Sequence, residues 1–381
     1  MIDLCIIGCG AAGMAAAVAY GMTAPDGEVC ILEKKEKPGR KLLATGNGRC
    51  NLSNMSCRNV DRTLDFFSSI GVITKADEEG RVYPASGSAA DVLTAMEKQL
   101  HAGNTKIITD MAVDSVEKDG DGFLIGKEIR SARVIIASGG KAGPQFGSTG
   151  DGYAIAKALG HSVNRVYPAL TGLESDDAEG LHGVRVKGKV ILMKKGAVIA
   201  EESGEIQFND HGFSGICVMD LSRHVTLDGE TGFRDYTMRI VTGPERPEDL
   251  LGQRRTIKGL TAGDMLLTII NTQLADLILE RAGINKNRPI GDVTDSEIEK
   301  IAFQMNNLDF KIRGARGWRK AQCTAGGVPY DQVNEDTMES KIVKDLYFAG
   351  EIMDYDGPCG GFNLDHAWNT GIRAGRAAAN V

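Results

Sequence analysis

The amino-acid sequence predicts an α/β protein: a Rossmann-like nucleotide-binding domain formed by both chain ends, with an inserted β-rich domain and a small helical subdomain. Three observations support this prediction. A glycine-rich turn joins a strand to a helix within residues 3–21. A strand and a glycine-led helix follow residue 346, and short strands with hairpin turns lie between the two ends. A strand–turn–helix opening is typical of a βαβ unit, so a parallel sheet is the expected framework.

Length and composition indicate a folded protein of more than one unit. The chain has 381 residues, of which 42% are hydrophobic and 25% are charged, values typical of globular proteins with two or three units. The net charge of −7 argues against a nucleic-acid partner, and no apolar run is long enough to span a membrane. The oligomeric state is left open by these observations.

The eight cysteines contain no CxxC pair, so neither a metal site nor a disulfide framework is expected. The start at Met1 enters a strand directly and lacks the basic and apolar regions of a secretion signal. Because disulfides are rare in reducing compartments, both observations favour the cytoplasm.

The first half of the chain alternates between strands and helices. Residues 3–7 and 29–32 read as buried parallel strands on either side of an alanine-rich helix at 11–21. A helix is expected near 61–70. Another is expected at 89–100, where Ser88 followed by Asp91 three residues later is an N-cap pattern. A small meander over 105–136 is then expected to end at Gly139-Gly140.

The middle of the chain changes character after Tyr167. Residues 189–194 and 197–201 flank Lys195-Gly196 and predict a hairpin. Apolar residues at helical spacing predict helices at 271–282 and 295–305. The predicted boundaries place the nucleotide-binding domain at 1–165 and 320–381, the inserted substrate-facing domain at 166–319, and the helical subdomain at 245–307.

The N-terminal turn has the pattern of a dinucleotide-binding fingerprint. Gly8-Cys9-Gly10-Ala11-Ala12-Gly13 lies between a strand and a helix, and Glu33 follows at the end of the second strand. The glycines permit a tight turn and a close approach to a pyrophosphate, whose charge the helix N-terminus stabilises. Glu33 can accept hydrogen bonds from ribose hydroxyls. The fingerprint alone does not separate FAD from NAD.

The C-terminal segment favours FAD. A short apolar strand at 346–351 ends in Gly350-Glu351, and Gly360-Gly361-Phe362-Asn363 opens a helix. The free N–H groups at such a helix start can stabilise negative charge at N1 and O2 of a reduced flavin. The Glu351 carboxylate is suited to a ribitol hydroxyl. On that helix Leu364, Ala367, Trp368, Gly371, Ile372 and Gly375 share one face.

Together these segments resemble a family of bacterial flavoproteins that includes aminoacetone oxidase and the BaiN-type reductase associated with bile-acid metabolism. The resemblance covers most of the chain. Its most specific parts are the fingerprint, residues 39–51 (Gly-Arg-Lys-Leu-Leu-Ala-Thr-Gly-Asn-Gly-Arg-Cys-Asn) and residues 324–375. Segments 81–84, 204–208 and 212–215 also match. The chain departs from the family pattern at Ile216, where proline is usual, and at Cys359, where a small hydroxyl residue is usual.

The resemblance implies an FAD domain made of both ends, and residues 46–48 close to the flavin. The fingerprint, the C-terminal segment and the resemblance together give a set of candidate cofactor-binding residues. These are Gly8, Gly10, Ala11, Ala12, Gly13, Glu33, Lys34, Arg40, Lys41, Gly46, Asn47, Gly48, Val113, Gly139, Gly350, Glu351, Gly361, Phe362 and Asn363.

Three further features allow two interpretations each. Cys50 could be a redox thiol, but no second thiol stands at suitable spacing, so a small buried residue is expected. The basic cluster Arg313, Arg316, Arg319 and Lys320 could bind an anionic substrate group or the FAD pyrophosphate, or could form ion pairs at the domain junction. His366 could donate a proton, but helical phase separates it from the apolar face and predicts a surface histidine.

The expected function is that of an FAD-dependent oxidoreductase, which transfers hydride between flavin N5 and a small organic substrate. A reductase of an activated C=C bond that uses NAD(P)H is the leading hypothesis. An oxidase of a small amine and a non-catalytic flavin-binding redox sensor are the alternatives. Gly139-Gly140 and Gly326-Gly327 lack the G-x-G-x-x-G spacing, so NAD(P)H is expected only as a transient donor without a domain of its own. The catalytic residues are not predicted.

Overall fold

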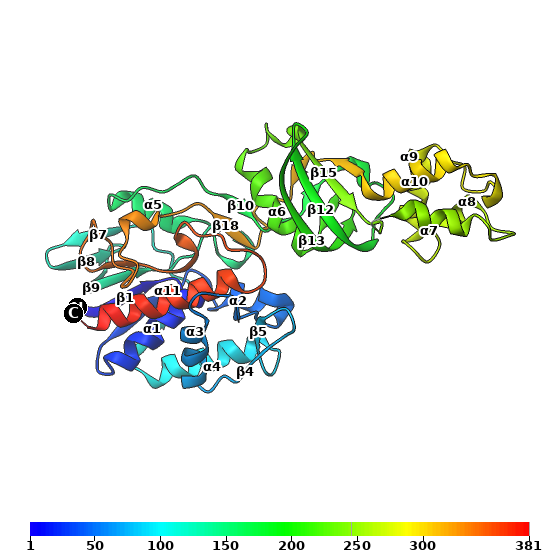
Figure 1. Cartoon of the computed structure of the whole chain (residues 1–381). Coiled ribbons are helices and arrows are strands. Elements are labelled where there is room, and N and C mark those ends of the chain that lie inside the picture. The colour runs from blue at the N-terminus through cyan, green and yellow to red at the C-terminus, as the bar shows by residue number, and fades with distance from the viewer. Residues whose placement is uncertain (245, 381) are drawn as a thin grey trace. The chain divides into compact units, whose positions relative to one another are not determined.

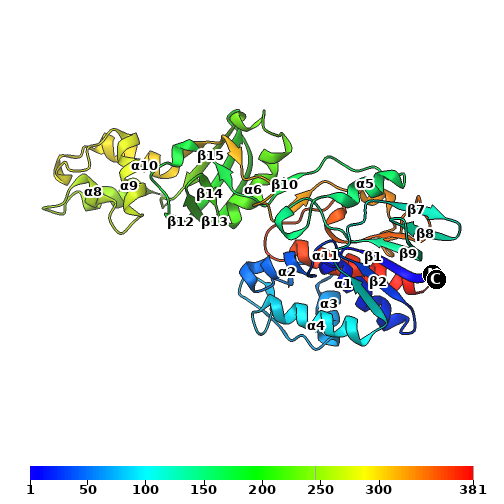
Figure 2. The ribbon, with the colours of Figure 1, turned by 180° about the vertical axis from the view of Figure 1, so that it is seen from behind.

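A computed structural model describes residues 1–244 and 246–380 (Figures 1 and 2). The chain divides into two compact units. The first consists of Met1–Pro168 and Ala321–Val381, and the second of Ala169–Lys320. No helix formed by the described residues is long and apolar enough to cross a membrane. Short strands β10 (Tyr167–Ala169) and β18 (Cys323–Ala325) stand where the chain leaves and re-enters the first unit.

The first unit is built on a mainly parallel sheet that contains both chain ends. Its strands follow the order β6-β2-β1-β9-β8-β7, and β19 also pairs with β9. Leu346 and Phe348 of β19 are in register with Val134 and Ile136 of β9, which pairs with β1 on its other side. The predicted joining of the two ends in one α/β fold is therefore confirmed. The strands are β1 (Ile2–Ile7), β2 (Val29–Leu32), β6 (Thr105–Ile108), β7 (Val116–Asp119), β8 (Gly122–Ile125), β9 (Ile129–Ile136) and β19 (Leu346–Phe348).

The expected meander over 105–136 is only partly correct. β7, β8 and the start of β9 do form antiparallel neighbours. The first segment of that range, β6, instead pairs in parallel with β2, with Val29 opposite Thr105. The alternating pattern does not distinguish these two arrangements, because β6 is an edge strand and none of its residues is fully buried.

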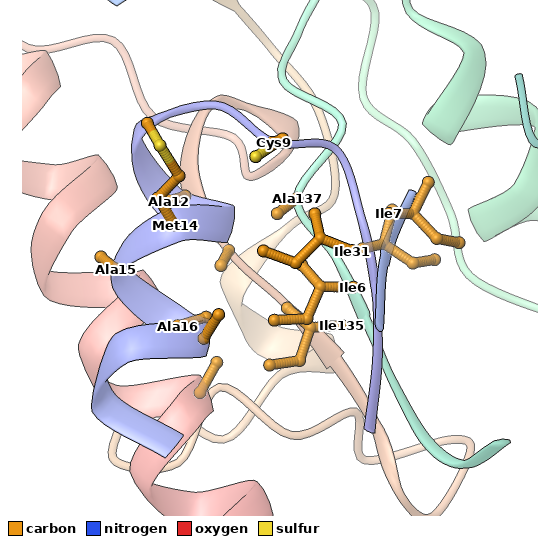
Figure 3. Close-up of a cluster of buried hydrophobic side chains, with 14 of the residues drawn as sticks. Ile6, Ile7, Cys9, Ala12, Met14, Ala15, Ala16, Ile31, Ile135 and Ala137 are labelled. Atoms are coloured by element: carbon orange, nitrogen blue, oxygen red, sulfur yellow. The ribbon is translucent and has the colours of Figure 1, made fainter. Parts of the chain in front are cut away.

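Two long helices pack closely on one face of this sheet. α1 (Ala11–Thr23) lies against α11 (Phe362–Ala379) (Figure 1). Gly371 and Gly375 of α11 touch the α1 backbone. A Cβ atom at either glycine would overlap the carbonyl oxygen of Ala12 or Ala16. On the opposite side of α1, small side chains such as Ala16 face Ile6 and Ile135 of the sheet (Figure 3). The fingerprint helix is thus held in place by the last helix of the chain.

Shorter elements complete the first unit. The expected N-cap is present: Ser88 accepts a hydrogen bond from the Asp91 amide at 3.3 Å. A three-stranded sheet in the order β3-β5-β4 lies beside the start of α11. The elements are α2 (Arg40–Ala44), β3 (Ser53–Asn54), α3 (Val60–Ser69), β4 (Thr74–Ala76), β5 (Arg81–Pro84), α4 (Ala89–Ala102) and α5 (Asp151–Ala158).

The second unit contains a seven-stranded sheet in the order β16-β15-β12-β13-β14-β11-β17. The predicted hairpin forms through Lys195-Gly196, and its strands β12 (Arg185–Lys194) and β13 (Ala197–Asn209) are longer than predicted. The other strands are β11 (Leu173–Glu174), β14 (Gly212–Ser214), β15 (Tyr236–Val241), β16 (Leu308–Lys311) and β17 (Gly314–Ala315).

The helices of the second unit share one hydrophobic core with its sheet. Ile278 and Ile301, from two of the helices, belong to the same buried cluster as Met238 and Phe310 of the strands. Residue 245, the first of the predicted helical subdomain, lies outside the described residues. The helices are α6 (Ile216–Leu227), α7 (Pro247–Arg254), α8 (Ala262–Met265), α9 (Thr272–Ala282) and α10 (Asp295–Asn306).

Candidate cofactor site

The fingerprint turn leaves one glycine open to a ligand. Gly8 has a φ of +105° and lies against Ala137, and a Cβ on Gly13 would overlap the Gly8 carbonyl oxygen. Both glycines are therefore needed for packing. Around Gly10 no atom lies within 4 Å of where a Cβ would stand. No side chain caps α1 at this end. Its first turn begins with Ala11 and Ala12 and contains no acidic residue. The N–H groups at this helix end are therefore available to an anionic ligand such as a phosphate.

Glu33 closes the same turn from the end of β2. Its carboxylate accepts hydrogen bonds from the amides of Cys9 at 3.0 Å and Lys35 at 2.9 Å. The Glu33 carbonyl oxygen accepts from the Met111 amide at 2.9 Å, which brings the segment of buried Val113 alongside. Lys34 is held by Asp151 and Thr149 at the start of α5. These contacts tie Glu33 to the fingerprint turn at Cys9, and Lys34 and the segment that leads to Val113 adjoin Glu33.

A polar network joins segments from both chain ends. Lys41 forms an ion pair with Glu351 at 2.6 Å and also donates to the Ala142 carbonyl oxygen at 2.9 Å. The second Glu351 oxygen accepts from the amide of Thr324 at 3.1 Å and from its hydroxyl at 2.8 Å. The Thr324 hydroxyl oxygen in turn accepts from the amides of Lys141 and Ala142. Sequence reasoning did not identify Thr324, because nothing in its local pattern marks a partner for Glu351.

The two ends also meet at the first turn of α1. Gly350 lies beside Ala12, and its amide donates to the Thr370 hydroxyl of α11 at 2.8 Å. Gly139, at the end of β9, has a φ of +74° and lies near Ser148. Arg40 begins α2 and is exposed. The structure thus brings the predicted residues of the fingerprint together with Lys41, Gly139, Gly350 and Glu351.

The start of α11 provides a second open helix end. The cap residue Gly361 has a φ of +108°, and a Cβ there would overlap the Ser53 carbonyl oxygen and lie 2.9 Å from Asn51 Oδ1. This Asn51 oxygen is buried without a hydrogen-bond partner among residues 1–244 and 246–380. An orphaned acceptor beside uncapped N–H groups fits the donor and acceptor edge of a flavin ring. Sequence reasoning did not single out Asn51.

Phe362 and Asn363 form the first turn of α11. The Asn363 side chain accepts from the Gly357 amide at 2.8 Å and donates to the Gly357 carbonyl oxygen at 2.9 Å. This side chain therefore shapes the turn that precedes the helix. The backbone N–H groups of residues 361–363 remain the donors that a ligand could use.

The loop at residues 46–50 has an unusual backbone. Gly46, Asn47, Gly48 and Cys50 all have φ between +55° and +84°, a region that asparagine tolerates better than most residues but that cysteine rarely adopts. Gly46 lies beside the Asn51 amide, so the loop borders the α11 end. The Arg49 guanidinium lies 4.8 Å from the centre of the Tyr83 ring, and among the described residues it forms no ion pair. Strained non-glycine residues of this kind cluster at functional sites.

Cys50 takes the simpler of its two interpretations, and two of the four residues of the basic cluster form ion pairs inside the second unit. Cys50 is fully buried, and burial raises the pKa of its thiol to about 12, which does not suit a redox thiol. Arg313 pairs with Asp176 at 2.8 Å, and Arg316 lies 3.7 Å from Glu174, both within the second unit. All eight cysteines are free. Among the described residues, no three His, Cys, Asp or Glu side chains gather as a metal site would require.

The prediction of a surface position for His366 is wrong. The ring is half-buried, stacked on Tyr355 with centroids 4.1 Å apart, and its Nε2 is hydrogen-bonded to the Tyr330 hydroxyl. Burial, with a smaller contribution from Arg373, lowers the pKa of His366 to about 3. Helical phase correctly places His366 away from α1, but it cannot show that residues 330 and 355 cover that other face.

This burial predicts an acid-sensitive contribution to stability. The folded-state pKa of His366 lies below its ordinary value of 6.5, so the unfolded chain takes up the proton more readily. The stabilisation is therefore present above pH 6.5 and is lost as the pH falls toward 3. The variant His366→Gln keeps an acceptor for Tyr330 but cannot be protonated. When the pH falls from neutral to mildly acidic, we expect its free energy of unfolding to drop by about 1 kcal/mol less than that of the wild type. Chemical denaturation at a series of pH values measures this, and parallel curves for the two proteins would contradict it.

The family of this chain is shown by its relatives. The sequence model of the HI0933-like protein Rossmann domain matches residues 58–377. A 3-dehydro-bile acid delta(4,6)-reductase from Clostridium scindens is 37% identical, with 98% of both chains covered. A ribosomal RNA dihydrouridine synthase from Escherichia coli is 26% identical, over 97% of this chain and 96% of that one.

Solved structures show the same fold at low sequence identity. A 3-ketosteroid delta1-dehydrogenase from Sterolibacterium denitrificans matches with a TM-score of 0.51, 12% identity and 99% of each chain covered. The open conformation of a flavocytochrome c3 fumarate reductase matches with a TM-score of 0.50 and 16% identity, over 100% of this chain and 77% of that one. The family match and the relative that is 37% identical along nearly the whole chain show that this protein belongs to the HI0933-like family and is an FAD-dependent oxidoreductase.

Proposed function

We propose that the protein reduces a carbon–carbon double bond that is conjugated to a carbonyl group, with NAD(P)H as the electron donor. The supporting observation is the 37% identity to a delta(4,6)-reductase along 98% of both chains. The name dihydrouridine synthase describes related chemistry, because dihydrouridine is uridine with one conjugated C=C bond saturated. The names of these relatives thus share reduction of a conjugated C=C bond, although their substrates differ greatly in size. No comparable observation favours an amine oxidase or a non-catalytic sensor.

The residues of the first unit have distinct tasks in this proposal. Bound FAD supplies the hydride chemistry. The N–H groups of α1 around Gly10 hold the pyrophosphate, and Glu33 holds the adenosine ribose. Asn51 and the start of α11 hold the flavin ring. The Arg49 guanidinium, which has no carboxylate partner in the described chain, would bind the substrate carbonyl oxygen, where negative charge develops when hydride adds to the distal carbon.

We infer a small-molecule substrate rather than nucleic acid, because the chain carries a net charge of −7. NAD(P)H would use the substrate site transiently, since the sequence contains a single G-x-G-x-x-G turn of the required context. Eight free cysteines, five of them among the most buried residues of the first unit, suit a reducing cytoplasm.

A two-step anaerobic experiment tests the function. NADH or NADPH alone should bleach the visible flavin absorbance, and the nicotinamide is then removed by gel filtration. Adding a conjugated enone, such as a 3-oxo-Δ4 steroid, should restore the absorbance and yield the saturated ketone. Small amines serve as the control and should not bleach the oxidised flavin. Bleaching by an amine, or reoxidation that requires nicotinamide to remain bound, would contradict the proposal.

A further inference from the structure

A buried carboxylate stands in the first turn of α11. Asp365 is only 6% exposed. One of its oxygens accepts from the hydroxyls of Ser53 at 2.7 Å and Thr63 at 2.6 Å, and the other accepts from the Asn369 amide at 3.1 Å. Within the described residues it has no ion-pair partner. Arg62 reaches only the Asn369 side chain, at 3.3 Å. The negative charge is thus held by neutral donors.

Hydrogen bonding alone does not explain why this side chain carries a charge. A neutral side chain could pin α11 to β3 and α3, whereas burying a carboxylate costs free energy that neutral donors only partly offset. The charge also acts on its surroundings. Burial and, after it, the Asp365 charge raise the pKa of the Cys57 thiol. A buried charge at one helix end is expected to act electrostatically at that end.

Asp365 is coupled directly to the candidate flavin end of α11. Ser53 donates its hydroxyl to Asp365, and its carbonyl oxygen lies against Gly361, the cap residue of the helix. The unpartnered Asn51 oxygen lies beside the same glycine. The positive end of the helix dipole and the Asp365 charge therefore occupy the same turn, and the carboxylate offsets part of the dipole.

We propose that Asp365 is a positioning residue that lowers the reduction potential of the bound flavin. This inference rests on the proposed function. Two-electron reduction adds negative charge to the flavin ring, which the α11 N-terminus stabilises and the Asp365 charge destabilises. The reduced cofactor is then a stronger hydride donor. That property favours transfer to a C=C bond over accumulation of reduced enzyme.

The test compares charge removal with hydrogen-bond removal in the FAD-loaded protein. The charge is removed in Asp365→Asn, whereas Thr63→Val removes a hydrogen bond and keeps the charge. Each variant is equilibrated anaerobically with a reference dye poised where the wild-type flavin is half reduced. We expect the ratio of reduced to oxidised flavin to rise about fivefold in Asp365→Asn, from the usual strength of charge–dipole interactions. In Thr63→Val the ratio should stay within about twofold of the wild type, although stability falls.

A second pair of variants tests the proposal if Asp365→Asn does not bind FAD. Asp365→Glu and Asp365→Gln are equal in size and differ in charge, so only the glutamine variant should show the raised ratio. An unchanged ratio in the neutral variants would overturn the proposal, as would an equal shift in Thr63→Val. Because the measurement uses no substrate, it can fail while the reductase activity stands. Absence of reductase activity with a shifted potential would instead contradict only the proposed function.

Discussion

Replacing Gly10 with valine is expected to abolish tight FAD binding while the apoprotein keeps its stability. Gly10 has φ −90° and ψ −168°, which any residue can adopt, and no atom lies within 4 Å of the added Cβ position. The valine side chain would therefore occupy the space where the pyrophosphate approaches the α1 N–H groups. Charge-assisted hydrogen bonds are worth roughly 1.5–3 kcal/mol each, so the loss of one or two predicts affinity weaker by about 100-fold or more. Titration of apoprotein with FAD, followed by flavin fluorescence, measures it.

Gly13→Ala and Gly21→Ala are the matched controls on the same helix. A Cβ at Gly13 would overlap the Gly8 carbonyl oxygen, so this variant should lose about 1–3 kcal/mol of apoprotein stability. Gly21 has no neighbour within 4 Å of an added Cβ, so alanine there should be neutral or slightly stabilising. If Gly10→Val unfolded as readily as Gly13→Ala, or bound FAD normally, the open face of Gly10 would not be the pyrophosphate site.

The sequence predicts those parts of the fold that local patterns determine. The fingerprint turn, the apolar strand at β19 and the glycines of α11 each carry a periodicity or spacing that only one local structure satisfies. Gly371 and Gly375 illustrate this: their spacing of four residues marks one helix face, and the structure places that face on α1. The union of both chain ends is expected from the C-terminal strand with its glycine-led helix and from the family resemblance, not from any periodicity.

Contacts between distant segments could not be predicted in this way. The Lys41–Glu351 pair joins residues 310 positions apart, and Thr324 enters it from a third segment. His366 was misplaced for the same reason, since its cover comes from two loops that carry no periodic pattern. The orphaned oxygen of Asn51 is visible only when every neighbouring donor has been placed. Satisfaction of buried polar groups is a property of the assembled unit, not of a local segment.

Breaking the Lys41–Glu351 pair is expected to reduce both stability and FAD affinity. The two side chains are 27% and 20% exposed, so the pair is partly shielded from water, and Glu351 also receives two hydrogen bonds from Thr324. We expect Lys41→Met to cost about 2 kcal/mol, because it leaves a poorly solvated carboxylate without its cation; this is less than for a fully buried pair. Urea denaturation of the apoprotein gives the stability, and FAD titration gives the affinity.

The double variant Lys41→Met/Glu351→Leu measures the interaction between the two charges apart from their contacts with other residues. If the two charges act on each other, removing both should cost less than the sum of the single substitutions, by about 1 kcal/mol or more. Glu351→Leu alone leaves the Thr324 hydroxyl and amide without their acceptor, so it should be the more damaging single change. Strictly additive losses would show that Lys41 and Glu351 stabilise the unit independently. The ion pair would then not be what holds the turn after β19 against α2, and the joining of the two ends would depend on the β19–β9 pairing and on the α1–α11 packing.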